Sequence, residues 1–81
     1  MSVEVRLLYF ASLRDAAGLP DETVITDAVA LSDLYRDRAR QHGFELPIER
    51  VRVAVDAEFV AWTDAPRAGS EVAFVPPVSG G

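Results

Sequence analysis

Residues 71–81 read EVAFVPPVSGG, an alternating apolar run followed by two prolines and, after Val78 and Ser79, a glycine pair. The run from Glu71 to Val75 predicts a β-strand, because apolar residues recur at every second position. Pro76 and Pro77 end that strand, since proline lacks the backbone N–H that a sheet ladder requires. One strand is not stable alone, so the fold depends on the elements that precede this one.

The chain begins with a similar run. Residues 3–10 alternate with period two and predict a strand whose core-facing residues are Val3, Val5, Leu7 and Tyr9. The same phase puts Leu8 and Phe10 on the outer face of the sheet. Two interpretations are open for this apolar pair: a second layer or a loop covers it, or a partner protein binds it.

Two helices and three further strands are predicted between these runs. We expect a short helix over residues 11–17, strands over 22–26, 51–55 and 59–62, and a main helix from a start between 28 and 32 to His42. Ser12 is a candidate N-cap of the short helix, and Asp27 and Ser32 are candidates for the main one. Gly18 and Gly43 follow the two helices, where glycine commonly ends a helix.

The order of these elements is strand, short helix, strand, main helix, hairpin and final strand. A single main helix must cover one face of a mixed sheet, which predicts an α+β roll of the ubiquitin-like β-grasp kind. The order alone leaves ferredoxin-like packing open as an alternative. We expect one domain over residues 1–76 and an extended, flexible tail over residues 77–81.

Composition excludes several classes of function. The chain has no cysteine and one histidine, so neither a disulfide nor a metal site is expected. A net charge of −5 argues against nucleic acid as a partner. No apolar run approaches the roughly 20 residues that span a bilayer, so no membrane association is expected and we place the protein in the cytoplasm.

All 8 basic residues are arginine. One interpretation is a general preference of the genome for arginine. The other is functional: without lysine, the chain offers no side-chain amine to an activated acyl group.

Familiar catalytic arrangements are also missing from the sequence. Ser32 and His42 fall on one predicted helix at opposite ends, about 15 Å apart, too far for a catalytic triad. The carboxylates show no pairing typical of acid–base catalysis, and we expect them to form a solvated surface. No glycine-rich phosphate loop appears, so the chain is not expected to bind a nucleotide by itself.

The tail is what remains as a source of chemistry. Pro76 and Pro77 favour an extended backbone that stands away from the sheet. Gly80 and Gly81 have no Cβ and can therefore enter a narrow channel. A free carboxylate is inert to acyl transfer, but a partner that adenylates it with ATP would make it electrophilic, and sulfide transfer would then leave a thiocarboxylate. The alternative is a frayed end without function.

Three stretches carry a resemblance to a known family: LLYFASLRDAAG at 7–18, VRVAVDAEFV at 51–60 and GSEVAFVPPVSGG at 69–81. They resemble the ubiquitin-like small subunit of molybdopterin synthase over nearly the whole length of the chain. The resemblance implies a sulfur carrier that binds no cofactor. An E1-like enzyme would use ATP to adenylate Gly81, and sulfide transfer would then give a thiocarboxylate.

The resemblance also implies partners and a site. The sulfur would pass to cyclic pyranopterin monophosphate within a heterotetramer of two small and two large subunits, to build the dithiolene of molybdopterin. Gly80 and Gly81 would form the reactive end. The implied partner-binding residues are Phe10, Arg14, Phe59, Phe74, Val75, Pro76, Pro77, Val78 and Ser79.

Some positions depart from the family pattern, and other functions stay open. Ser70 stands where an aspartate is common, Asp56 where an asparagine often turns the hairpin, and Val75 where an aromatic residue is frequent. The same tail would serve a sulfur carrier for thiamine or cysteine synthesis, or a ubiquitin-like protein modifier. A β-grasp interaction module with an incidental glycine pair is the alternative without sulfur chemistry.

Overall fold

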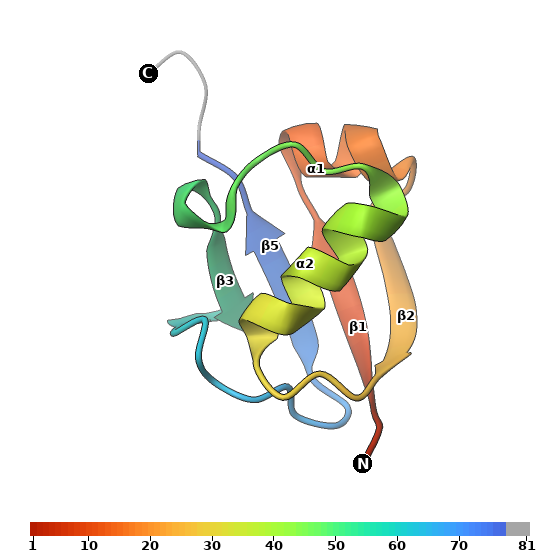
Figure 1. The fold of residues 1–81 in the computed structure, drawn as a ribbon, viewed down its shortest axis with the longest axis vertical. Helices are drawn as coiled ribbons and strands as arrows, with labels where there is room; N and C mark the ends of the chain where they lie inside the picture. The colour runs from red at the N-terminus through yellow and green to blue at the C-terminus, as the bar shows by residue number, and fades with distance from the viewer. Residues whose placement is uncertain (78–81) are drawn as a thin grey trace.

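The computed structural model describes residues 1–77, which form five strands, two α-helices and one 3-10 turn (Figure 1). In chain order these elements are β1 (Val3–Tyr9), α1 (Ala11–Ala17), β2 (Asp21–Thr26), α2 (Leu31–His42), η1 (Ile48–Arg50), β3 (Arg52–Val55), β4 (Glu58–Val60) and β5 (Glu71–Val75). All the predicted helices and strands are present. The predicted glycine tail falls on residues 78–81, which lie outside the described residues.

The strands form one mixed sheet in the order β2-β1-β5-β3-β4. The first and last strands, β1 and β5, are parallel neighbours at its centre, with Leu7 opposite Val72. The other neighbouring pairs are antiparallel. Helix α2 crosses one face of the sheet and α1 lies beyond the end to which β5 points (Figure 1). This is the predicted β-grasp arrangement, and the ferredoxin-like alternative is wrong.

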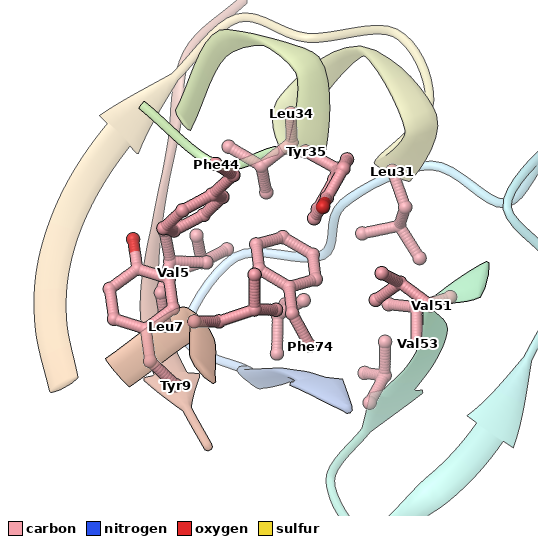
Figure 2. Packing of buried hydrophobic residues seen from close by; sticks show 13 residues of the cluster. Val5, Leu7, Tyr9, Leu31, Leu34, Tyr35, Phe44, Val51, Val53 and Phe74 are labelled. Carbon is pink, nitrogen blue, oxygen red and sulfur yellow. The ribbon is translucent and has the colours of Figure 1, made fainter. Parts of the chain in front are cut away.

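The core lies between the sheet and α2 (Figure 2). The phase predicted for the first strand is confirmed: Val5, Leu7 and Tyr9 are buried, and Val3 packs against them. The remaining buried core residues are Leu13, Leu31, Leu34, Tyr35, Phe44, Val51, Val53, Val55, Val72 and Phe74. The alternation in the strands therefore separates a core face from an outer face that α2 does not reach.

The start of α2 differs from the prediction, because no side chain caps it. The N-cap residue is Ala30. The N–H groups of Leu31 and Ser32 donate instead to the carbonyls of Asp64 and Trp62, at 2.8 and 3.0 Å. A distant loop thus supplies the acceptors that a helix N-terminus lacks, which removes the need for a capping side chain.

The second strand of the β3–β4 hairpin ends earlier than predicted. Strand β4 ends at Val60, so Trp62 lies in the following turn and not in a strand. Its indole N–H donates to the Val51 carbonyl at 3.1 Å, and its ring stacks on Phe74. These contacts hold the partly buried Trp62 against the core, and alternation in the sequence does not predict them.

Glu22 is an exception to the expectation that the carboxylates form a solvated surface. One of its oxygens accepts hydrogen bonds from the Tyr9 hydroxyl and from His42 Nε2, each at 2.5 Å, and Arg38 lies 3.7 Å from the other. Burial alone would raise the pKa of Glu22, but these hydrogen bonds and the nearby positive charge hold that pKa below its ordinary value. The cluster joins β1, β2 and the end of α2.

This cluster makes stability depend on pH. Because the pKa of Glu22 is lowered by folding, its contribution is complete above the ordinary pKa of 4.5 and is lost as the pH falls through the lower, folded value. We expect Glu22→Gln to lower the free energy of unfolding at neutral pH by about 1 to 3 kcal/mol. Urea unfolding from neutral pH down to about pH 3 measures this, and the difference between variant and wild type should shrink toward the acid end. A difference that does not change with pH would contradict the assignment.

Candidate functional site

The tail leaves the domain from the centre of the sheet. Strand β5 is paired with β1 on one side and β3 on the other, so the backbone is held up to Val75. Pro76 is buried and Pro77 is exposed. The exit point is therefore fixed by two strand ladders before the chain reaches residue 78. The predicted site residues Val78, Ser79, Gly80 and Gly81 lie outside the described residues.

The outer face of the sheet carries an apolar row beside this exit. In the strand registers Leu8 lies opposite Ala73, Ala73 opposite Ala54, and Ala54 opposite Phe59. Residues directly opposite each other share a face, so the row crosses β1, β5, β3 and β4. Val75 is on the same face, opposite Arg52. We call Leu8, Phe10, Ala54, Phe59, Ala73 and Val75 the outer patch.

The two phenylalanines of the outer patch are open to solvent. The exposed fraction is 45% for Phe10 and 56% for Phe59, and nothing within residues 1–77 forms a second layer over them. Of the two interpretations of the outer apolar residues, coverage by a second layer is thus wrong for Phe10. Large exposed aromatic groups on a flat face are typical of a protein-binding surface.

Two members of the predicted site need correction. Phe74 has an exposed fraction of 0%, so it is a core residue and cannot contact a partner while the domain is folded. Its ring lies between Tyr35 and Trp62, at centroid distances of 5.2 and 5.9 Å. Pro76 is also buried, and only borders the surface beside Val75. The alternation of β5 explains both, because Val72, Phe74 and Pro76 share the inward phase.

The remaining predicted residues gather in two places. Phe10 and Arg14 meet at the start of α1, where the Phe10 carbonyl accepts the Arg14 N–H at 3.4 Å. Ala11 has a φ of 50°, so the chain turns sharply just after Phe10. Phe59, Val75 and Pro77 lie together at the tail exit. On the outer face, the row of Leu8, Ala73 and Ala54 leads from the end of β1 to Phe59.

A hollow of about 320 Å³ at the tail exit was not predicted from the sequence. Its lining residues are Glu49, Arg50, Arg52, Phe59, Val75, Pro76 and Pro77. The Arg52 guanidinium carbon lies 3.8 Å from the centre of the Phe59 ring, a cation–π contact. The alternation of residues 51–55 in the sequence places Arg52 on the outer face. Its position opposite Val75, at the base of the tail, comes from the pairing of β3 with β5.

The outer patch yields a prediction that separates binding from stability. We expect Phe59→Ala and Phe10→Ala each to weaken binding of a partner protein by about tenfold or more, because exposed aromatic groups are common hot spots. The free energy of unfolding should change by about 1 kcal/mol or less, since both rings are outside the core. Calorimetric titration and urea unfolding of the same samples measure the two quantities. Unfolding of both variants would show that these residues belong to the core.

Residues 1–77 contain no group of three or more His, Asp or Glu residues that could hold a metal ion. His42 is engaged by Glu22 on the opposite side of the sheet from the outer patch. No helix within residues 1–77 is long and apolar enough to cross a membrane. The arrangement can present a tail and a binding face.

Solved structures with the same fold come from archaea and bacteria. SAMP1 of Haloferax volcanii matches with a TM-score of 0.77 at 28% identity, over 96% of this chain and 99% of that one. A putative molybdopterin converting factor subunit 1 from Pyrococcus furiosus gives a TM-score of 0.75 at 27% identity, over 94% and 99%. The complex of subunits 1 and 2 of the Helicobacter pylori molybdopterin-converting factor matches at 18% identity, TM-score 0.64, over 98% and 100%, and shows the fold alone.

Curated relatives match over nearly the whole chain. A molybdopterin synthase sulfur carrier subunit from Mycosarcoma maydis is 35% identical over 95% of this chain and 92% of its own length. A protein of the same name from Chlamydomonas reinhardtii is 31% identical over 98% of this chain and 100% of its own length. The profile of the ThiS family matches residues 7–81. The chain therefore belongs to the ThiS family, by its β-grasp fold and by its sequence from the first strand onward.

Proposed function

We propose that this chain is the sulfur-carrier subunit of a molybdopterin synthase. The observation that carries the proposal is the position of the tail: it leaves the central strand of the sheet, next to an open apolar face, in a chain without cysteine. The names of the full-length relatives from Mycosarcoma maydis and Chlamydomonas reinhardtii support the same role. In this role residues 1–76 are the binding domain and residues 77–81 are the arm that carries sulfur.

The proposed chemistry takes place on the carboxylate of Gly81. That carboxylate attacks the α-phosphate of ATP and pyrophosphate leaves, which produces an acyl-adenylate. Sulfide then attacks the acyl carbon and AMP leaves, so the terminus becomes a thiocarboxylate. The thiocarboxylate sulfur forms a C–S bond to the pterin precursor, cyclic pyranopterin monophosphate, as an oxygen leaving group departs from that carbon. Water then hydrolyses the acyl–sulfur bond, which leaves the sulfur on the pterin and releases the carrier as a carboxylate. Two such cycles supply the two sulfurs of the dithiolene.

The carrier needs two partners for these steps. An E1-like enzyme supplies the ATP site, since this chain has no glycine-rich phosphate loop. A large subunit receives the tail and holds the pterin, in a heterotetramer of two small and two large subunits. The relatives from Chlamydomonas reinhardtii and Mycosarcoma maydis are named as subunits of a molybdopterin synthase, which supports a partner of this kind. As proposed, the assembly works in the cytoplasm, where ATP is available.

Intact mass spectrometry combined with product formation tests this function. Incubation with ATP, an E1-like enzyme and a sulfur donor should raise the mass by the difference between one sulfur and one oxygen. The thiocarboxylated protein, mixed with a large subunit, should then convert cyclic pyranopterin monophosphate to molybdopterin. Failure to gain mass with a competent activating enzyme would contradict the carrier role. A mass gain without molybdopterin would point to another sulfur pathway.

A second candidate is a protein modifier, because the SAMP1 structure of Haloferax volcanii is as similar as the converting-factor structure. A modifier would transfer its adenylated tail to lysine amines of target proteins. This chain has no lysine, so it would not form polymers through its own side chains. Conjugates of the chain on lysine in a cell extract, with no molybdopterin formed, would favour this candidate.

A further inference from the structure

The arginines divide into two groups by their surroundings. Four of them form ion pairs with carboxylates: Arg6, Arg36, Arg38 and Arg40. The pairs of Arg36 with Asp33 and of Arg40 with Asp37 are the local charge pairs expected on the main helix. Arg14, Arg50, Arg52 and Arg67 form no ion pair with any residue in the described part of the chain, although the molecule has an excess of acidic residues.

Two of these unpaired arginines, Arg50 and Arg52, lie together at the base of the tail. Both line the hollow that also contains Val75, Pro76 and Pro77. Arg52 is fixed by strand pairing, since it lies opposite Val75. Arg50 belongs to η1, which lies at the end of the sheet toward which β5 points (Figure 1). Both arginines therefore line the hollow beside the point from which the chain continues to residue 78.

The local charge is opposite to that of the whole protein. Among residues 1–77, Glu49 is the single acidic residue that lines the hollow, beside two arginines. The net charge of the chain is −5. The tail exit is thus a positive spot on a negative molecule, and it favours an acidic group on whatever approaches.

The cation–π contact orients one of these groups for binding. With its carbon 3.8 Å from the ring centre of Phe59, the Arg52 guanidinium covers a face of that ring. In such stacking the N–H groups at the edge of the guanidinium stay free to donate to a carboxylate. The ring itself retains an exposed fraction of 56%, which leaves apolar surface beside the charge.

We infer that this hollow is a docking site for a carboxylate side chain, with an apolar neighbour, on the protein surface that receives the tail. The inference rests on the proposed function, in which that surface belongs to the large subunit. The carboxylate accepts hydrogen bonds from Arg52 and Arg50, and the apolar neighbour packs on Phe59 and Val75. Contact at this site sets the position of the tail base as the tail enters the partner.

Charge-altering variants test the docking site. Arg52→Glu and Arg50→Glu place a carboxylate against the proposed carboxylate, whereas Arg52→Leu removes the charge but keeps apolar cover over Phe59. Arg67→Glu is the matched control: Arg67 also has no ion pair among the described residues, and it lies in the loop before β5, at the other end of that strand. The melting temperature of each variant is measured first. Each variant is then titrated into the purified large subunit at about 0.05 M and about 0.5 M salt.

We expect Arg52→Glu to weaken binding by about tenfold or more at low salt and Arg52→Leu by a smaller factor. Arg50→Glu should weaken it severalfold, and the Arg67→Glu control should stay within about twofold. High salt should reduce the differences. Equal binding of wild type, Arg52→Glu and Arg50→Glu would overturn the docking site while leaving the carrier role intact. A loss of affinity that correlates with the decrease in melting temperature, and not with the change of charge, would also overturn the docking site. A wild-type protein that does not bind the large subunit would overturn both.

Discussion

Replacing Phe74 with alanine should lower the free energy of unfolding by about 3 to 5 kcal/mol, which is the usual loss for a buried phenylalanine. Its ring has an exposed fraction of 0% and lies among the rings of Tyr9, Tyr35 and Trp62. Truncation would leave a cavity between the sheet and α2. Native domains have a total stability of about 5 to 15 kcal/mol, so a domain near the lower end of that range would be partly unfolded after this loss.

Urea unfolding followed by the fluorescence of Trp62 measures this loss directly, since Trp62 is the only tryptophan and its ring stacks on Phe74. Far-UV circular dichroism gives a second probe that does not depend on that contact. Phe59→Ala is the matched control, because it removes the same number of atoms from the open face of the same sheet. A comparable loss of stability in both variants would contradict the assignment of Phe74 to the core and Phe59 to the surface.

Periodicity in the sequence was sufficient to predict the strands and their faces. Alternation in the first strand assigned Val5, Leu7 and Tyr9 to the core and Phe10 to the outer face, as the structure shows. The same rule, applied to β5, assigns Phe74 inward. The resemblance to the family implied Phe74 as a partner contact, and its burial in the core contradicts this. Alternation places neighbouring residues on opposite faces, whatever their distance from the functional end.

The features that the sequence did not predict depend on contacts between distant segments. The acceptors at the start of α2 are backbone carbonyls of Trp62 and Asp64, and no residue type marks a carbonyl in advance. Glu22 meets His42 only after β2 and α2 pack together. The hollow at the tail exit needs η1, β3 and β5 side by side. Local patterns report on one element at a time, so such juxtapositions require the three-dimensional fold.

Deleting Gly81 should reduce molybdopterin formation by about 100-fold or more while leaving the stability of the domain unchanged. The proposed reaction is on the terminal carbonyl carbon, and loss of one residue withdraws that carbon by roughly 3.3–3.6 Å from its position in the partner. Misplacement of a reacting group by about 1 Å can already decrease a rate by about 100-fold. Stability should be unaffected because the last strand ends at Val75, before the deleted residue.

The assay separates the two steps that need the tail. Mass spectrometry after treatment with the activating enzyme reports whether the shortened terminus gains sulfur, and incubation with the large subunit reports transfer. Addition of one glycine after Gly81 shifts the carbonyl in the opposite direction and should be equally damaging, whereas Arg67→Ala, at the far end of β5, should retain wild-type activity. Molybdopterin formation above a tenth of the wild-type rate by the deletion variant would exclude a position-dependent terminus. If both length variants bind the large subunit normally but transfer no sulfur, then the folded domain supplies binding, and the length of the tail determines whether the sulfur reaches the reacting position.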